Sequence, residues 1–239
     1  MRPTPVLVAL ISLGCLLSGK IQAASLQISP ITIILASGET ATTVEVTNLG
    51  GAPAAIQARP YLWIQSGDED TLTPTEDIIL SPPIFTVPAG ASQTMRLLVR
   101  GGGVAEAERS YRLLLDEVPP ANSRIKQIGF ALRVSLPVIL ASASPTPPVL
   151  RWGVERGLDG ETQLTAVNPG HAYDKVGAID VTLPDGSHPK VIPRATNPYI
   201  LPGASRHWIV QGSGGSPGGP LHLSITSRAG KSEQSLAAP

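Results

Sequence analysis

The chain has 239 residues with 18 Lys and Arg against 18 Asp and Glu, and this zero net charge, without any basic run, argues against nucleic-acid binding. Glycine and proline number 24 each, yet 42% of the residues are hydrophobic, which excludes a collagen repeat and a disordered polymer. The single cysteine cannot form an intramolecular disulfide or a cysteine-based zinc site, and the four histidines show no ligand spacing. We therefore expect neither a metal nor another cofactor.

The first 23 residues have the anatomy of a secretory signal peptide. An early positive charge at Arg2 precedes an apolar stretch from Val6 to Leu17, and the small residue Ala23 ends the segment. The stretch is shorter than the roughly 20 residues of a membrane-spanning helix, and nothing later in the chain is long and apolar enough to replace it. We expect cleavage after Ala23 and no stable membrane insertion. A lipoprotein site at Cys15 is the weaker alternative, because the apolar run continues past it.

From residue 24 onward, the sequence predicts an all-β protein. Short β-branched segments alternate with turn residues at a spacing of about eight to twelve residues, which is typical of a sandwich or barrel. A first domain, residues 24–143, is expected to contain the strands Leu26–Leu35, Ala41–Asn48, Ala54–Gln65, Ile78–Leu80, Ser92–Val99, Ser110–Glu117 and Gln127–Leu140. Residues 144–148 include three prolines and are predicted to be a semi-rigid linker between domains.

A second, smaller β domain is expected over residues 149–230, with turns such as Asn168-Pro169-Gly170 between its strands. Its predicted strands are Leu150–Val154, Glu161–Val167, Lys175–Leu183, Lys190–Ile192, Tyr199–Leu201, Ser205–Val210 and Leu221–Thr226. Residues 231–239 are predicted to be a disordered tail.

The sequence lacks the motifs of enzymes with known mechanics, such as a nucleophile elbow, a phosphate-binding loop or a zinc-protease helix. Asp116 and Glu117 are adjacent on a predicted strand, so their carboxylates point to opposite faces and cannot share a substrate. We therefore predict that the protein is not an enzyme. The acidic segment Gly67–Asp70 lacks the ligand spacing of a calcium loop and is interpreted as a solvated hairpin tip.

One long predicted strand has a hydrophobic face. Bulky apolar residues at every second position, Ile128, Phe130, Leu132, Val134 and Leu136, alternate with small or polar ones. This row either packs in the core of its own domain or is lent, as a donor strand, to the unfinished sheet of another protein.

Another predicted strand, Glu108–Glu117, places arginines within an apolar run. Arg109 and Arg112 are three positions apart and therefore face opposite sides of the sheet. A partly buried arginine needs an anionic partner, and its fork-shaped guanidinium suits a carboxylate. That carboxylate is either an internal one, such as Glu108 or Asp116, or one that belongs to a ligand.

Several segments, in this order, resemble the first domain of periplasmic chaperones of the chaperone–usher pathway: Ala24–Leu35, Glu45–Asn48, Val87–Gly90 with Met95–Leu97, Tyr111–Pro120 and Ile128–Leu136. The second domain is similar through Val167–Gly170 and Tyr199–Gly203 with Trp208. The resemblance covers essentially the whole chain after the signal peptide. Within it, Tyr111–Pro120 most resembles the archaic, sigma-type branch, which is associated with spore-coat-protein-U-like subunits.

The resemblance implies two immunoglobulin-like β-sandwich domains in an angled, boomerang-like arrangement, in a protein of the periplasm. Its partners would be pilus or fimbrial subunits whose own sandwich lacks the last strand, and an outer-membrane usher that takes them over. The chaperone would cap each subunit with its donor strand. Capping is physically reasonable, because an open apolar sheet edge promotes aggregation.

The sequence departs from the family's better-known branch at the anchor for the subunit's terminal carboxylate. An Arg and a Lys form that anchor there, whereas the matching positions here are Thr32 and Pro137, which carry no charge. A carboxylate that enters the site still needs a cation or several N–H donors. Arg112 is the expected replacement, with Arg96 and Arg133 in reserve.

Two alternatives from other classes are a secreted β-sandwich module that binds or hydrolyses sugars and a structural surface subunit. A sugar-binding module is expected to expose aromatic platforms, whereas Trp63, Trp152 and Trp208 are better interpreted as core and inter-domain anchors. A complete donor strand and a second domain weigh against a subunit.

Overall fold

The computed structural model describes residues 25–101, 106–119, 131–157, 160–211 and 219–237. Every regular element in these ranges is a β-strand, and the strands form four sheets, so the all-β prediction is confirmed. The described part of the chain contains no helix with the length and apolar character to cross a bilayer. The predicted signal peptide and the predicted donor residues Ile128 and Phe130 lie outside the described residues.

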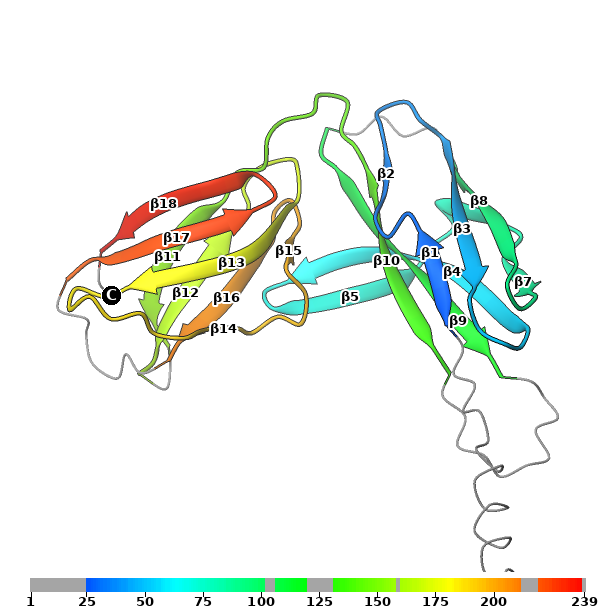
Figure 1. Ribbon diagram of the computed structural model, residues 1–239. Coiled ribbons are helices and arrows are strands. Elements are labelled where there is room, and N and C mark those ends of the chain that lie inside the picture. The colour runs from blue at the N-terminus through cyan, green and yellow to red at the C-terminus, as the bar shows by residue number, and fades with distance from the viewer. Residues whose placement is uncertain (1–24, 102–105, 120–130, 158–159, 212–218, 238–239) are drawn as a thin grey trace, which may run out of the picture.

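The first ten strands form one sandwich of two sheets (Figure 1). One sheet has the order β1-β3-β8-β6, with β1 Leu26–Ser29, β3 Ala41–Asn48, β8 Ser92–Val99 and β6 Ile78–Ser81. The other has the order β2-β10-β9-β4-β5, with β2 Ile33–Leu35, β10 Arg133–Leu140, β9 Arg109–Val118, β4 Ala54–Ser66 and β5 Glu69–Pro74, while β7 Ile84–Val87 pairs with β4.

The core of this sandwich consists of alternate residues on the facing strands. Val44 and Val46 of β3, Leu97 of β8 and Leu113 of β9 are at most 1% exposed. This period of two is what the sequence pattern predicts for strands that are buried on one face. Full burial of each such side chain stabilises the fold by about 1.5–3 kcal/mol.

The remaining eight strands form the second sandwich. One sheet has the order β11-β12-β16-β14, with β11 Arg151–Arg156, β12 Thr162–Val167, β16 Ser205–Val210 and β14 Val191–Pro193. The other has the order β15-β13-β17-β18, with β15 Tyr199–Ile200, β13 Asp174–Thr182, β17 Leu221–Ser227 and β18 Gly230–Leu236. β10 ends at Leu140 and β11 begins at Arg151, so the two sandwiches divide on either side of residues 144–148.

Equivalent buried asparagines hold a turn in each domain. The Nδ2 of Asn48 donates a hydrogen bond to the carbonyl of Val87 at 3.0 Å, and the Nδ2 of Asn168 donates to the carbonyl of Ile200 at 3.0 Å. In both turns the Oδ1 accepts from the main-chain N–H of the glycine two residues later, at 2.9 and 3.0 Å. Both side chains are fully buried, so the two domains share one plan at this turn.

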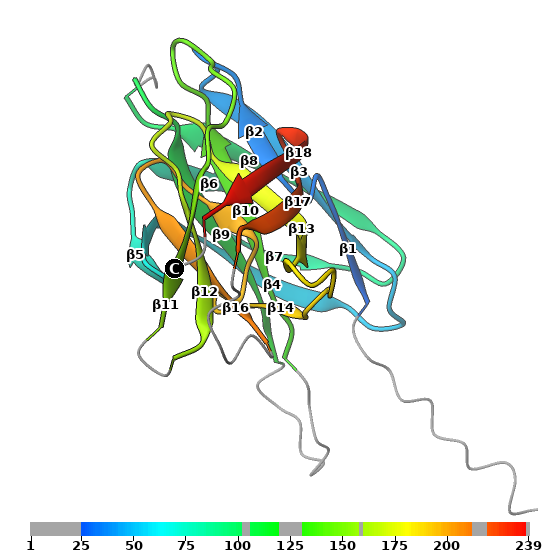
Figure 2. The same cartoon turned by 90° about the vertical axis from the view of Figure 1, so that its left-hand side faces the viewer.

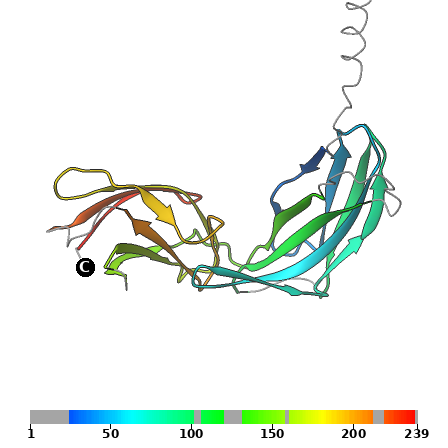
Figure 3. The ribbon, with the colours of Figure 1, turned by 90° about the horizontal axis from the view of Figure 1, so that it is seen from below.

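The two sandwiches are set at an angle to each other, as the views in Figures 1 and 3 show. The hairpin of β4 and β5 extends from the first sandwich to the second, where its tip meets β15 and β16. The domains are therefore joined by side-chain contacts as well as by the chain that runs from β10 to β11.

Among the differences from the predicted elements, two change which segments pair in the sheets. The single strand predicted for Leu26–Leu35 is divided into β1 and β2, which belong to different sheets, because Pro30 lacks the N–H that would continue the ladder. The predicted disordered tail forms β18 as far as Leu236, and β18 pairs with β17 along its whole length. Figure 2 shows β18 beside β17 at the margin of its sheet.

Candidate functional site at the domain junction

Strand β9 separates two chemically different faces. Tyr111, Leu113 and Leu115 point into the core of the first domain and are at most 2% exposed. Ser110 and Arg112 alternate with them and therefore lie on the opposite side of the sheet. By the same alternation, Arg109 and Arg112 lie on opposite faces of β9, as predicted.

Arg112 lies in a row that crosses three strands. In the sheet register it is opposite Tyr61 of β4 and Pro137 of β10, and residues in such a row point to one face. We call the side of the sheet that carries Tyr61, Trp63, Ser110, Arg112 and Pro137 the junction face. Arg112 is thus the immediate cross-strand neighbour of Pro137, the uncharged residue that the family resemblance matches to an anchor lysine.

The junction face meets the second domain at an aromatic cluster. Trp63 is 2% exposed and packs in the hydrophobic cluster of the second domain. Its ring centroid lies 5.4 Å from that of Tyr199, at an interplanar angle of 74°. The interpretation of Trp63 as an inter-domain anchor is confirmed, and so is that of Trp208, which is 8% exposed in the same cluster.

Arg112 is placed on this aromatic cluster. Its guanidinium carbon lies 3.7 Å from the ring centroid of Trp63 and 5.3 Å from that of Tyr199. The Nζ of Lys175, on β13, lies 5.5 Å from the same Tyr199 centroid. Aromatic faces attract cations, so two positive charges from two domains gather around one tyrosine ring. Nothing in the sequence pattern indicated Lys175 or its proximity to Arg112.

Arg112 is 9% exposed, and within the described ranges no hydrogen bond or ion pair joins its guanidinium to another residue. Burial lowers the pKa of Arg112, and the nearby negative charge of Asp70 offsets only part of this effect. The group stays charged at neutral pH, because an arginine pKa lies far above it. A buried cation without a partner is unfavourable by itself, and it is suited to bind an anion.

The two internal partners considered for Arg112 are bound elsewhere. Asp116 accepts hydrogen bonds from Arg59, at 2.5 Å, and from Arg133, and the bond from Arg133 is the largest cause of its lowered pKa. Glu108 accepts a hydrogen bond at 2.6 Å from a main-chain N–H of the second domain. Arg112 therefore forms an internal ion pair with neither Glu108 nor Asp116 in the described part of the chain.

The structure does not bring the two reserve residues together with Arg112. Arg133 is 62% exposed at its side chain and is held by Asp116 near the start of β10. Arg96 is exposed on β8, opposite Thr43, in the sheet that does not carry the junction face. Of the three arginines, Arg112 is the one at the domain junction, and its role as a carboxylate anchor stays a prediction.

The described part of the predicted donor row divides into buried and exposed members. Leu136 is 3% exposed and belongs to the core of its own domain, and Val134 is half-buried against that core. Leu132 precedes β10 and is 39% exposed. Leu136 is thus packed in its own domain, because the alternation that predicts a free apolar face continues into the packed part of β10, and its place in the donor row stays an untested prediction.

The acidic hairpin tip is also corrected by the structure. The main-chain N–H of His207 donates to Asp68 at 2.9 Å, and the imidazole Nδ1 of His207 lies 3.0 Å from the other oxygen of Asp68. Asp70 forms an ion pair with Arg206. The tip is thus a contact with the second domain and not a solvated turn. Local spacing could not reveal partners that are distant in the sequence.

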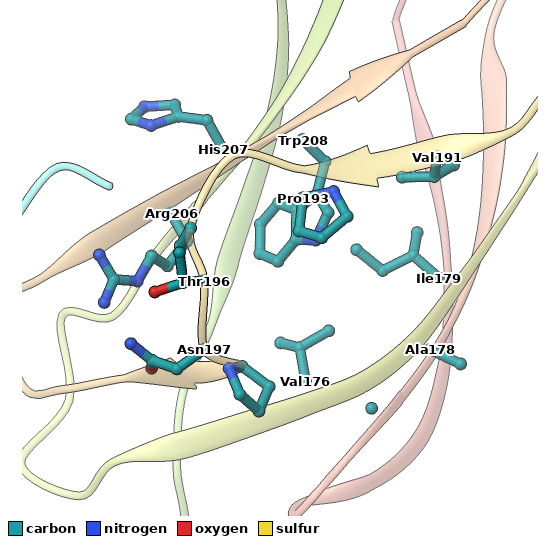
Figure 4. A pocket seen from close by; sticks show the side chains of 13 residues that line it. Val176, Ala178, Ile179, Val191, Pro193, Thr196, Asn197, Arg206, His207 and Trp208 are labelled. Atoms are coloured by element: carbon teal, nitrogen blue, oxygen red, sulfur yellow. The ribbon is translucent and has the colours of Figure 1, made fainter. Parts of the chain in front are cut away.

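A separate cavity of about 390 Å³ lies in the second domain between β13, β14 and β16. Figure 4 shows Arg206 and His207 on the side of this pocket opposite Val191 and Ile179. Both polar side chains are held by the hairpin tip of the first domain, so the free lining is largely apolar. The pocket contains none of the predicted site residues.

Comparison with known proteins identifies the family. The profile of the PapD N-terminal domain of pili and flagellar-assembly chaperones matches residues 25–144, which is half of the chain. The chain therefore belongs to this family of chaperones, and membership favours that class over a sugar-binding module or a structural subunit.

Two curated relatives are fimbrial or related chaperones. The chain is 34% identical to the chaperone protein FimB/FhaD of Bordetella pertussis over 104 residues, which is 41% of each protein. It is 22% identical to the uncharacterized fimbrial chaperone YhcA of Escherichia coli K12 over 144 residues, 60% of this chain and 62% of that one. The matched stretches thus span less than two thirds of these relatives.

Solved structures of low sequence identity share the whole architecture. The CsuC–CsuE complex of chaperone and tip adhesion subunit, from the archaic Csu pili of Acinetobacter baumannii, matches with a TM-score of 0.68 and 23% identity, over 89% of this chain and 98% of that one. The complex of the SafA pilin with the SafB chaperone of Salmonella enterica matches with a TM-score of 0.63 and 20% identity, over 90% and 97%. These likenesses confirm the predicted fold of two immunoglobulin-like domains.

Proposed function

We propose that the protein is a periplasmic chaperone that binds incomplete pilus or fimbrial subunits by donor-strand complementation and delivers them to an outer-membrane usher. The observation that carries the proposal is Arg112, a buried guanidinium without a hydrogen-bond or ion-pair partner in the described residues, beside the strand that would be donated. The solved complexes support the partner class, because they contain a chaperone with a tip adhesion subunit and a chaperone with a pilin.

Arg112 would bind the terminal carboxylate of the subunit. A guanidinium stacked on an indole face keeps the N–H donors at its edge available for in-plane hydrogen bonds. Such a bond would replace the solvation that Arg112 has lost on burial, so the charge that is unfavourable in the free protein would favour the complex.

Leu132 and the row that precedes it in the sequence would be donated to the subunit. From Pro137, which is opposite Arg112, the strand leads back to Leu132 over five residues, or about 17 Å at the rise of a β-strand. Main-chain hydrogen bonds would supply affinity along this stretch, and alternate apolar side chains would fill the subunit's groove. The anchor and the donor row would thus act on one extended ligand.

The function can be tested by co-purification of the tagged full-length protein from its native host, followed by mass spectrometry. We expect the wild type to recover a pilus or fimbrial subunit from the periplasmic fraction. Arg112→Ala should lose most of that subunit while it stays folded, because the anchor is gone. Arg100→Ala is the matched control, since Arg100 pairs with Glu76 at 3.2 Å and both side chains are at least 60% exposed.

Each outcome of this experiment is informative. A wild-type protein that folds but recovers no such subunit would contradict the chaperone function. Full recovery with Arg112→Ala would retain the chaperone function and reject Arg112 as the anchor. Equal losses with Arg112→Ala and Arg100→Ala would indicate a general effect of charge and would also reject the anchor.

A further inference from the structure

The carboxylate of Asp70, at the tip of the β4–β5 hairpin, is held by three donors. Its Oδ1 accepts from the Nη2 of Arg206 and from the Nε2 of Gln65, the latter at 3.2 Å. Its Oδ2 accepts from the Nδ2 of Asn197. Arg206 and Asn197 belong to the second domain, so both oxygens of Asp70 are used in a contact between the domains.

Arg206 is a fixed component of this contact. Its side chain is 1% exposed, and each of its three nitrogens has an acceptor. Besides the ion pair with Asp70, its Nη1 donates to the carbonyl of Gly67 at 2.7 Å and its Nε donates to the carbonyl of Tyr199 at 3.2 Å. A guanidinium with all its nitrogens occupied has little freedom to move toward another carboxylate.

Arg112 is a close neighbour of this contact. It lies over the ring of Tyr199, whose main-chain carbonyl is bound by Arg206. The charge of Asp70 acts to raise the pKa of Arg112, and the charge of Arg206 acts to lower it, although burial has the largest effect. The Asp70 carboxylate is bonded to Arg206 and to Gln65, and Gln65 lies two positions along β4 from Trp63, the ring that Arg112 contacts.

We infer that Arg206 is a positioning residue that keeps Arg112 free for a ligand carboxylate by holding Asp70 in the hairpin tip. The inference rests on the proposed function, because it concerns the availability of the Arg112 anchor. Without Arg206, Asp70 loses its charged partner, and pairing with Arg112 then satisfies two buried or half-buried charges at once. The protein would neutralise its own anchor, and a ligand carboxylate would have to displace Asp70.

The test is a binding titration with a small carboxylate and its neutral counterpart. The probes are N-acetyl-phenylalanine and its amide, which share an apolar ring and differ in the charge of the terminal group. The readout is the indole N–H resonance of Trp63, which contacts Arg112 and is one of three tryptophans, so that Trp63→Phe assigns it. Wild type, Arg206→Gln, Asp70→Asn and the double variant are compared, each on the full chain and each checked for its folded spectrum.

We expect the wild type to bind the carboxylate more tightly than the amide. Arg206→Gln should bind the carboxylate about tenfold more weakly, since an ion pair with Asp70 now competes. The double variant Arg206→Gln with Asp70→Asn should recover at least the wild-type affinity, because an uncharged amide in place of the Asp70 carboxylate cannot neutralise Arg112. A purely structural role of Arg206 would not be rescued by the second substitution.

The possible failures are distinguishable. A wild type that does not discriminate the carboxylate from the amide would reject the Arg112 anchor, and this inference with it. If the wild type does discriminate, two results would overturn the inference and leave the anchor intact. One is wild-type affinity for the carboxylate in Arg206→Gln, and the other is no rescue of that affinity in the double variant. If Arg206→Gln does not fold, the single variant Asp70→Asn tests the inference. Asp70→Asn should bind the carboxylate at least as tightly as the wild type, and weaker binding overturns the inference.

Discussion

The guanidinium carbon of Arg112 lies 3.7 Å from the ring centroid of Trp63, so the centre of the domain junction is a cation stacked on an indole. The stack contributes favourably, by about 0.5–2 kcal/mol for such pairs, but the desolvation of an unpartnered charge opposes it. We therefore expect the net contribution of Arg112 to folding to be small, although the residue is almost completely buried.

Arg112→Met should separate stability from binding. Methionine retains an apolar stem against Trp63 and removes the charge, so the free energy of unfolding should stay within about 1 kcal/mol of the wild type, or exceed it. Binding of a peptide with a free terminal carboxylate should be lost. Urea denaturation and a binding titration measure the two effects. A loss of more than about 2 kcal/mol of stability would show that Arg112 has a structural partner.

Lys175→Gln should weaken carboxylate binding by about 1.4- to fivefold, because an exposed cation near an anion contributes about 0.2–1 kcal/mol. The difference should shrink as salt is raised, since screening acts on exposed charges. Lys231→Gln is the control: Lys231 is 66% exposed and lies 3.9 Å from Glu233 in β18. Titrations at low and high salt test this prediction, and equal effects of the two substitutions would reject a role of Lys175 at the junction.

Leu132 and Leu136 should respond differently to substitution, although they belong to one apolar row. Leu136→Ala should lower the free energy of unfolding by about 2–5 kcal/mol, because Leu136 is 3% exposed in a packed core. Leu132→Ser should change it by less than about 1 kcal/mol and should reduce recovery of the subunit. Denaturation curves and co-purification provide the two measurements. A large loss of stability in Leu132→Ser would place Leu132 in the core instead.

Glu108→Gln should change the pH dependence of stability. Burial raises the pKa of Glu108, and the hydrogen bond from the N–H of Tyr173 and the charge of Arg228 offset this only in part. A raised pKa means that the folded state favours the protonated acid, so this stabilising contribution is complete below the ordinary glutamate pKa of about 4.3 and is lost as the pH rises through the folded-state pKa.

Glutamine imitates the protonated form and still accepts the bond from Tyr173. The variant should therefore match the wild type near pH 3 and be the more stable protein at pH 7. Thermal unfolding across this range measures the difference. A Glu108→Gln protein that is less stable than the wild type at pH 7 would mean that the ionised carboxylate is the favoured form.

The sandwich architecture could be predicted because most strands follow the period of two. Alternation in β9 also indicated correctly that Arg112 and the core residue Leu113 lie on different faces. The strands that lack this pattern could not be predicted. All six residues of β5 are exposed, and β18 is exposed at most positions, so no hydrophobic face marks either strand in the sequence.

The candidate site could be predicted only in part. Arg112 was recognisable as a charge within an apolar run. Its surroundings depend on how two domains meet, and Tyr199, Lys175 and Arg206 all come from the second domain. Gly67–Asp70 was interpreted as an isolated acidic turn for the same reason, because its partners Arg206 and His207 also come from the second domain.

Strand β18 is the outermost strand of its sheet within the described ranges, and its composition has a consequence for the proposed function. From Lys231 to Ser235 it carries only charged or polar side chains, most of them exposed. A short, polar strand with charges is a poor template for further pairing. A subunit with an open groove, or a second copy of this chain, would find little to bind along that margin. This margin of the second domain is in this way protected from the strand exchange that we propose for the first domain.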